Sequence, residues 1–239
     1  MSAIEDVVIL CGGRGTRLQE SERFIPKPLV EIGNEPIVWH VINIYAAQGF
    51  RRFMLCTGYR SDLIEQFISS RTWPEGVEVR CVDTGLDTPT GGRIKRAGAL
   101  LGGRPFCATY ADGVANVDLP RLVDIHRAHG GLATMTVVRP ELQFGIAQID
   151  ARGRVRGFRE KPRSDHWVNG GFFCFEPDSF GYIGAESELE GEPLERLAAD
   201  GQLHAFRHEG FWQCMDTFKD VVRLNDVWSA GEAPWRVWD

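Results

Sequence analysis

The sequence lacks any apolar run long enough to cross a membrane, and basic residues are not in excess. The longest early apolar run covers residues 7–11, far below the roughly 18 residues that a membrane span needs. The 239 residues include 27 Lys and Arg against 33 Asp and Glu, a net charge of −6. We therefore expect no nucleic acid and no membrane as a partner. An anionic substrate would require a local cluster of cations instead.

Cysteine is scarce, and its six copies lie far apart, at positions 11, 56, 81, 107, 174 and 214. None forms a C-x-x-C pair or stands beside a histidine at zinc-binding spacing, which argues against a zinc site. The four at positions 11, 56, 107 and 174 lie inside apolar segments, as reduced and buried thiols do. The acidic N-terminus also lacks the basic region of a signal peptide. We therefore expect a cytoplasmic protein.

Strand-like and helix-like segments alternate through the first half of the chain. Short apolar runs predict strands, and apolar residues at helical spacing predict helices. The predicted strands cover residues 7–11, 53–57, 77–82, 106–110 and 133–138, and the predicted helices residues 37–45, 63–68, 94–101 and 119–129. Repetition of this unit implies right-handed crossovers and a Rossmann-like α/β fold, with a mixed, mostly parallel sheet flanked by helices. Ligands bind such sheets beyond the carboxyl ends of the strands.

The second half of the chain changes character. Apolar segments at 146–149 and 155–158 flank a short turn and predict an added β-hairpin. Further predictions are a strand at 168–175 and helices at 192–200 and 217–228. The last residues, 231–239, hold a proline and two tryptophans, and we expect them to form an arm docked on the body. No internal repeat is present, so a single domain over residues 1–239 is expected.

The strongest motif follows the first predicted strand, where residues 12–18 read Gly-Gly-Arg-Gly-Thr-Arg-Leu. A glycine-rich turn after a strand lets backbone N–H groups approach phosphate oxygens, and arginine adds a forked cation. Leu18 stands where a dinucleotide-binding fingerprint needs Gly or Ala, which disfavours an oxidoreductase. No Gly-Lys-Ser/Thr of a P-loop follows either. The remaining alternative is a tight turn with surface arginines.

A lysine flanked by prolines follows, in Pro26-Lys27-Pro28-Leu29. The prolines hold Lys27 in extended backbone rather than in a helix. Taken alone, this pattern is typical of an exposed turn. Next to a glycine-rich loop, it favours a site for a polyphosphate.

Together these motifs resemble those of the sugar-1-phosphate nucleotidylyltransferases, and the resemblance runs along nearly the whole chain. Residues 12–18 and 26–28 carry the family pattern. Two longer segments point to the branch of glucose-1-phosphate cytidylyltransferases: residues 83–93 (Asp-Thr-Gly-Leu-Asp-Thr-Pro-Thr-Gly-Gly-Arg) and 212–217 (Trp-Gln-Cys-Met-Asp-Thr). The segments at 110–114, 160–162 and 169–173 add to the likeness.

The resemblance implies an enzyme in which an oxygen of a sugar 1-phosphate attacks the α-phosphorus of a nucleoside triphosphate. Pyrophosphate leaves and a nucleotide sugar forms. For the cytidylyltransferase branch, the substrates are CTP and glucose 1-phosphate, and the product is CDP-glucose. Mg²⁺ is the implied cofactor, and a homo-oligomer is the implied assembly. Such a reaction needs in-line positioning of the substrates and neutralisation of charge on the phosphates.

The resemblance also implies roles for individual residues. Arg17 and Lys27 match the catalytic contacts with the triphosphate. The nucleotide-binding positions are Leu10, Gly12, Gly13, Arg14, Gly15, Thr16, Gly91, Gly92 and Asp112. The sugar-phosphate positions are Gly145, Glu160, Lys161, Asn169 and Gly170, and the metal positions are Asp112 and Asp216. Residues 1–140 would then form mainly the nucleotide-binding half, and residues 141–239 mainly the sugar-binding half with the C-terminal arm.

Each of these assignments competes with a plain structural role. Asp112 follows a predicted strand and precedes a glycine, as a turn-forming aspartate does, and Asp216 could cap the next helix. Glu160 and Lys161 also suit a charged hairpin end. Gly91 and Gly92 are expected in a loop near the nucleobase. We favour the metal role for both aspartates, since Mg²⁺ is commonly held by one or two carboxylates and substrate phosphates.

Three positions depart from the family pattern. Ala111 replaces a glycine, Asn116 an aspartate and Cys214 a proline, and the segment 67–77 is shorter than usual. These departures leave the reaction class intact but open the choice of substrates. Another sugar 1-phosphate, or GTP, UTP or dTTP, in a specialised sugar or antibiotic pathway is the main alternative. A nucleotide-sugar binding subunit without turnover is the non-enzyme alternative.

Overall fold

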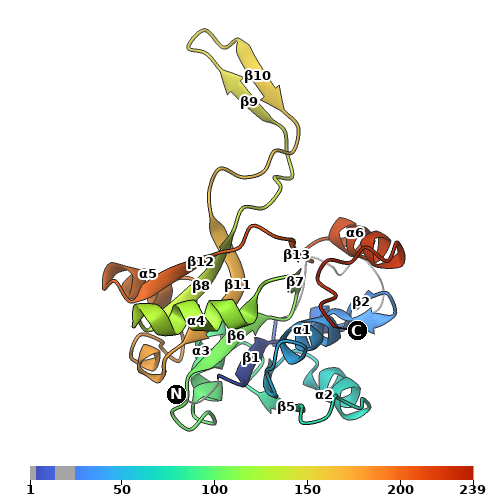
Figure 1. Cartoon of the computed structure of the whole chain (residues 1–239), viewed down its shortest axis with the longest axis vertical. Coiled ribbons are helices and arrows are strands. Elements are labelled where there is room, and N and C mark those ends of the chain that lie inside the picture. The colour runs from blue at the N-terminus through green and yellow to red at the C-terminus, as the bar shows by residue number, and fades with distance from the viewer. Residues whose placement is uncertain (1–3, 14–24, 239) are drawn as a thin grey trace.

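A computed structural model describes residues 4–13 and 25–238 and shows a body built around one sheet, with a projecting arm (Figure 1). Seven strands form the central sheet in the spatial order β12-β8-β11-β6-β1-β4-β5. Their bounds are β1 (Asp6–Leu10), β4 (Arg52–Thr57), β5 (Glu78–Asp83), β6 (Phe106–Tyr110), β8 (Ala133–Val138), β11 (Val168–Phe175) and β12 (Leu203–Arg207). Within the described ranges, the helices are too short or too polar to cross a membrane.

The sheet is mixed and mostly parallel, as the sequence predicts. β1 pairs in parallel with β4 and β6, β4 with β5, and β8 with β12. β11 is the exception, since it runs antiparallel to both β6 and β8. The carboxyl ends of β1, β4, β5 and β6 therefore meet at one edge of the sheet. That edge is where a ligand site is expected.

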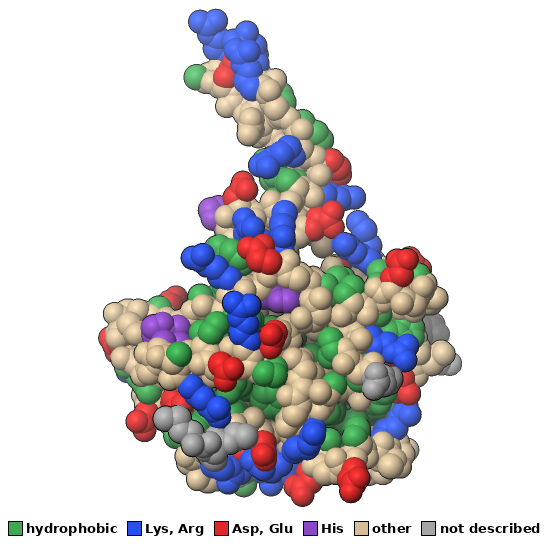
Figure 2. Space-filling model, in the orientation of Figure 1, with side chains coloured by type: hydrophobic (Ala, Val, Ile, Leu, Met, Phe, Trp, Pro, Cys, Tyr) green, Lys and Arg blue, Asp and Glu red, His purple; other side chains and the backbone are tan. Residues whose placement is uncertain are grey.

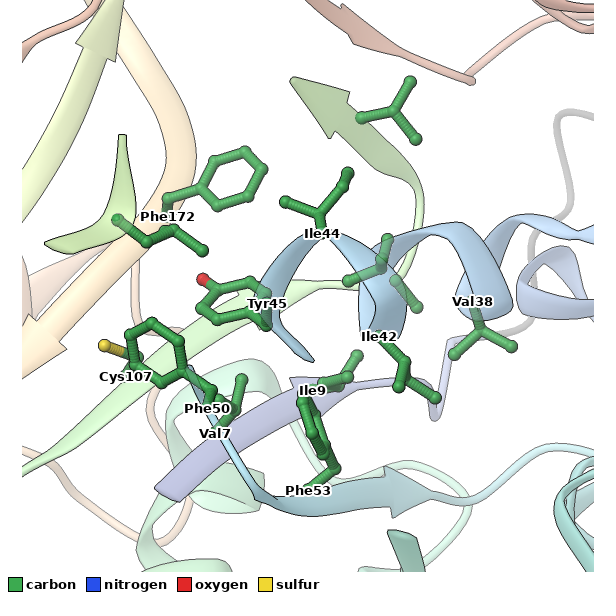
Figure 3. Close-up of a cluster of buried hydrophobic side chains, with 14 of the residues drawn as sticks. Val7, Ile9, Val38, Ile42, Ile44, Tyr45, Phe50, Phe53, Cys107 and Phe172 are labelled. Atoms are coloured by element: carbon green, nitrogen blue, oxygen red, sulfur yellow. The ribbon is translucent and has the colours of Figure 1, made fainter. Parts of the chain in front are cut away.

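Helices cover both faces of the sheet, because each strand turns alternate side chains to opposite faces. In β1, Val7 and Ile9 belong to one core and Val8 to the other. Figure 3 shows part of the first core, where the ring of Tyr45 lies 5.9 Å from that of Phe172. The first core includes α1 (Ile37–Ala46), α2 (Ser61–Ser69), α4 (Leu119–His129) and α6 (Phe218–Ser229), and the second α3 (Thr90–Gly98) and α5 (Glu192–Ala199). Each fully buried aliphatic or aromatic side chain contributes about 1.5–3 kcal/mol.

Among the longer elements, α3 and β12 differ from the sequence prediction. Helix α3 begins at Thr90 rather than near Ile94, because Pro89 supplies an extended N-cap with φ −70° and ψ 167°. The sequence does not predict β12, since only Phe206 of its five residues is buried. An edge strand with one buried side chain produces no apolar run. Two short antiparallel pairs, which were not predicted either, complete the body: β2 (Glu31–Ile32) with β3 (Glu35–Pro36), and β7 (Gly113–Ala115) with β13 (Trp212–Cys214).

The predicted hairpin forms and projects from the body as an arm (Figure 1). Strand β9 (Ile146–Ile149) pairs antiparallel with β10 (Val155–Arg159). Lys and Arg side chains gather near the tip of the arm (Figure 2), where Asp150 accepts hydrogen bonds from Arg154 and Arg156. The arm is a sheet of two strands only. The ion pairs of Asp150 add contacts at the turn that joins them.

The C-terminal segment docks on the body, as the sequence predicts. Trp235 is fully buried, and its ring lies 5.3 Å from that of Phe211 and 6.2 Å from that of Trp228 in α6. Its Nε1–H donates to His40 Nδ1 at 3.3 Å, and the other ring nitrogen of His40 contacts Ile32 O at 2.9 Å. His40 therefore carries its proton on Nε2 and is neutral.

This arrangement predicts a pH-dependent loss of stability. Burial lowers the pKa of His40 from 6.5 to about 4. Since the unfolded chain takes up the proton first, the stability that neutral His40 contributes is complete above about pH 6.5 and declines as the pH falls toward about 4. Between about pH 7 and about pH 5, the free energy of unfolding is expected to fall by about 2 kcal/mol on account of this residue. Chemical denaturation of the wild type and of His40→Gln at the two pH values measures the difference. An identical pH dependence in both proteins would contradict the assignment.

Candidate active site

The residues predicted to bind the nucleotide converge at the carboxyl edge of the sheet. Leu10 ends β1, Gly12 and Gly13 follow it, and Asp112 follows the neighbouring strand β6. With Thr90 at the start of α3, they line a groove of about 590 Å³, which we call the nucleotide groove. Beyond strand ends, backbone N–H groups are free to face a ligand, which suits a phosphate-bearing molecule.

Lys27 bridges two carboxylates beside this groove. Its ammonium lies 2.6 Å from Asp112 Oδ2 and 2.6 Å from Asp216 Oδ1. Lys27 begins a short 3₁₀ helix (Lys27–Leu29), so the expectation that the prolines keep it out of a helix is wrong. Only Pro26 before it is extended, with φ −62° and ψ 141°, and Pro28 fits the first turn of the helix. Burial alone would lower the pKa of Lys27, but the attraction of Asp112 and the hydrogen bonds to both aspartates outweigh it and raise the pKa. Lys27 therefore stays charged and offsets part of the negative charge of the pair.

Asp216 is positioned by the segment between β13 and α6. The alternative that Asp216 caps α6 is wrong: Thr217 is the N-cap, and it forms a capping box with Asp220. The N–H of Met215 donates to Asp112 O at 2.8 Å. This bond ties together the two segments that carry the carboxylates and brings the Asp216 side chain next to Lys27.

Asp112 and Asp216 meet the first requirement of a divalent-metal site. One oxygen of each carboxylate and Cys214 Sγ lie within 4.8 Å of one another. Carboxylate oxygens are the ligands that Mg²⁺ prefers, and Mg²⁺ keeps its other positions for water and phosphate. Burial, with help from the two aspartates, raises the pKa of the Cys214 thiol. The residues present fit a hard divalent cation shared with substrate phosphates.

A second cavity, of about 220 Å³, opens beside the same two carboxylates. Asn169 and Gly170 of β11 line it together with Asp112 and Asp216, and we call it the sugar cavity. The Asn169 amide donates to the Tyr110 hydroxyl at 3.3 Å, which fixes how the amide is turned. The predicted sugar-binding pair therefore lies across from the predicted metal pair.

The other predicted sugar-phosphate residues lie on the arm. Lys161 lines a large groove of about 1020 Å³ that also contains Asp216. Its backbone is left-handed, with φ 43°, and its ammonium lies 3.9 Å from Glu160 Oε1. Gly145 lies against Glu160, because a Cβ on it would come within 2.8 Å of Glu160 Oε2. Glu160 and Gly145 line none of these three cavities, whereas Lys161 shares a groove with Asp216.

Four predicted residues of the glycine-rich loop lie outside the described residues. They are Arg14, Gly15, Thr16 and Arg17. Their roles at the triphosphate stay predictions.

Gly91 and Gly92 do not lie in a loop, so that expectation is wrong. They form the first turn of α3, which packs against the segment before α5. A Cβ on Gly91 would lie 2.6 Å from Ser187 O, and one on Gly92 would lie 2.1 Å from Ala185 O. Close packing therefore accounts for both glycines, and their contact with a nucleotide stays a prediction.

Sequence reasoning assigned no role to two charged residues of the nucleotide groove, Arg93 and Glu190. Thr90 Oγ1 donates to Glu190 at 2.7 Å, and the Tyr110 hydroxyl donates to the same carboxylate. Through Tyr110, which also contacts Asn169, Glu190 links the nucleotide groove to the sugar cavity. The Thr-Gly-Gly-Arg motif was the available signal for Arg93, whereas no local pattern marks Glu190.

Comparison with known proteins assigns the family. Residues 6–231 match the nucleotidyl transferase family. The chain belongs to this family. It is 40% identical to the glucose-1-phosphate cytidylyltransferase of Salmonella typhi over 97% of this chain and 99% of that protein. It is 38% identical to a probable glucose-1-phosphate cytidylyltransferase of Bacillus subtilis (strain 168), with the same shares covered. Among solved structures, HddC from Yersinia pseudotuberculosis superposes with a TM-score of 0.75 at 23% identity, over 94% of this chain and 100% of that one, which shows a shared fold.

In this nucleotidyltransferase, the three departures from the family pattern fall on structural positions. Ala111 is buried, with 3% of its surface exposed. Asn116 Oδ1 accepts a hydrogen bond from Phe211 N at 2.8 Å and so holds the chain that enters β13. Cys214 Sγ donates to Asp216 Oδ2 at 3.3 Å. None of the three removes a carboxylate or a cation from the site.

The bridging lysine leads to a kinetic prediction. We expect Lys27→Met to lower kcat by about 100-fold or more, the loss typical when a group that stabilises developing charge is removed. Without the ammonium, the two carboxylates repel each other and the triphosphate loses a cation. Steady-state assays that detect pyrophosphate measure the effect. Lys95→Met is the matched control, since Lys95 is an exposed lysine of α3 that donates to Ile183 O and lines none of the three cavities, so this variant should keep nearly full activity. A wild-type kcat in Lys27→Met would refute the role.

Proposed function

We propose that this nucleotidyltransferase transfers a cytidylyl group from CTP to glucose 1-phosphate, giving CDP-glucose and pyrophosphate. The observation that carries the proposal is the cluster of Lys27, Asp112 and Asp216, because Asp112 lines both the nucleotide groove and the sugar cavity. A group that borders both spaces is placed where the two substrates react. The cytidylyltransferase relatives at 38% and 40% identity support this choice of substrates.

The reaction needs little covalent help from the protein, so the residues act by position and charge. The triphosphate lies in the nucleotide groove, with Gly12 and Gly13 allowing close approach of the backbone to the phosphates. Lys27 offsets charge on the α-phosphate and on the leaving pyrophosphate. The sugar phosphate enters from the opposite side, through the sugar cavity, as an in-line attack requires.

We further propose Mg²⁺ as the cofactor. Asp112 and Asp216 would hold it together with phosphate oxygens, and it would supply positive charge to the phosphates during the transfer. The two carboxylates favour Mg²⁺, because carboxylate oxygens suit this hard cation.

We assign the sugar phosphate to two groups of residues: one lines the sugar cavity, and the other lies on the arm. Asn169 offers a donor and an acceptor to sugar hydroxyls. Gly170 lines the same cavity, and its missing Cβ, which would lie 3.0 Å from Val138 of the neighbouring strand, leaves room for that side chain. Lys161 is the cation for the phosphate, with Glu160 and Gly145 beside it on the arm. A cytoplasmic location and a homo-oligomeric assembly stay predictions from the sequence.

The substrate pair is tested by a matrix of reactions. Purified protein is incubated with Mg²⁺, each of CTP, UTP, GTP, ATP and dTTP, and several sugar 1-phosphates, while pyrophosphate release is recorded. We expect the highest kcat/KM for CTP with glucose 1-phosphate. A higher value for another pair would reassign the substrates within the same reaction class. Binding of CDP-glucose without turnover in any pair would support the alternative of a binding subunit.

Lys161 allows a second test of the same proposal. Lys161→Ala should raise the KM for the sugar 1-phosphate by about tenfold or more and leave the KM for the nucleotide nearly unchanged, because it removes one charge-assisted contact. Arg154→Ala, which removes a cation near the tip of the same arm, is the matched control and should change neither constant. An unchanged KM for the sugar 1-phosphate in Lys161→Ala would remove this residue from the site.

A further inference from the structure

Arg93 lies in the first turn of α3, directly beneath the nucleotide groove. Only 4% of its surface is exposed, which is unusual for an arginine. Its helix neighbours Lys95 and Arg96 sit in the last turn instead. A buried arginine is costly unless every donor finds an acceptor, so its partners show what it holds together.

The guanidinium of Arg93 makes four hydrogen bonds to segments that are distant in the sequence. Its Nη1 donates to Thr57 O at 2.8 Å and to Thr84 Oγ1 at 2.7 Å. Its Nη2 donates to Gly12 O at 3.1 Å and to Leu86 O at 3.1 Å. Thr57 ends β4, and Thr84 follows β5. Gly12, which follows β1, and Leu86, which follows β5, both line the nucleotide groove. We call these two segments its Gly12 wall and its Leu86 wall.

Gly12 and Gly58 lie so close to the guanidinium that a side chain at either position would collide with it. A Cβ on Gly12 would lie 2.0 Å from Arg93 Nη1, and a Cβ on Gly58 would lie 2.7 Å from the same atom. Real Cβ atoms do not approach so closely, so a side chain at either position would displace the guanidinium. Arg93 therefore requires a glycine at position 12.

The charge of Arg93 is not cancelled by its hydrogen-bond partners. All four acceptors are neutral carbonyl or hydroxyl oxygens. Arginine keeps its proton in proteins, so a full positive charge lies beneath Gly12. In this partly desolvated place, the charge acts on nearby phosphate oxygens more strongly than it would in water.

We propose that Arg93 is a positioning residue for nucleotide binding. Its guanidinium sets the separation between the Gly12 wall and the Leu86 wall of the groove and places a buried positive charge under the phosphates. The inference rests on the proposed function in so far as the ligand of this groove is a nucleoside triphosphate. Lysine cannot take this place, because a single ammonium nitrogen does not reach four acceptors arranged around a planar fork.

The test compares Arg93→Lys with Lys95→Gln, a matched control on the same helix. Lys95 donates to Ile183 O at 2.6 Å, away from the nucleotide groove. A second variant, Thr84→Val, removes one acceptor of Arg93 at nearly constant volume and serves if Arg93→Lys does not fold. For each protein we would measure the KM of both substrates, kcat, the affinity for CTP with Mg²⁺ by calorimetry, and amide hydrogen exchange.

We expect Arg93→Lys to raise the KM for the nucleotide by about tenfold or more, with the KM for the sugar 1-phosphate nearly unchanged. Exchange of the amides at Gly13 and in residues 85–88 should become faster, because both walls lose an anchor. Thr84→Val should shift both readouts in the same direction by less, and Lys95→Gln should shift neither. A merely structural role would lower the melting temperature without separating the two KM values.

Two outcomes would overturn the inference. One is wild-type nucleotide affinity and amide exchange in Arg93→Lys or, if that variant does not fold, in Thr84→Val. The other is an equal change in both KM values. Failure of the proposed function is a separate result, since it shows as absence of turnover in the wild type with every substrate pair. In that case calorimetry and amide exchange still decide whether Arg93 positions the groove.

Discussion

The ammonium of Lys27 lies between two carboxylates that come from positions 85 and 189 residues further along the chain. Two carboxylates this close repel each other. The positive charge of Lys27 offsets that repulsion and holds the Asp112 and Asp216 side chains side by side. The site can form only when the segment after residue 25, the end of β6 and the end of β13 are all in place. Folding of the whole body is therefore a condition for the chemistry.

The same edge of the sheet is also organised by close packing around small residues. Gly91 and Gly92 let α3 lie against the segment before α5, since a Cβ on either would strike a backbone oxygen. This brings the first turn of α3 to the groove and places Arg93 under the strand ends. Glycines in this protein thus serve two purposes: approach of the backbone to a ligand, and approach of one element to another.

The sequence predicts the order of elements well because each buried strand and each amphipathic helix leaves a local pattern. It predicts Lys27, Asp112 and Asp216 because their motifs are short and continuous. It fails where the decisive partner is distant in the chain, as with the contact of Tyr110 and Glu190, which are separated by 80 residues. The family resemblance also placed Gly91 in a loop near the nucleobase, whereas Pro89 and tertiary packing start helix α3 there.

The negative net charge of the chain constrains how it can bind polyanions. The nucleotide groove itself contains Asp87, Glu188 and Glu190 beside Asp112. Glu190 is held by Tyr110 and Thr90, so its charge is partly offset by hydrogen bonds. A triphosphate entering this groove meets carboxylates as well as cations, and it gains most where it lies over Arg93 and next to Lys27. Specific placement of a few cations, rather than a general positive field, therefore decides where the phosphates lie. A triphosphate that arrives with a bound divalent cation is repelled less by the carboxylates of the groove. Carboxylate oxygens can also bind such a cation, which adds an attraction that the free triphosphate lacks.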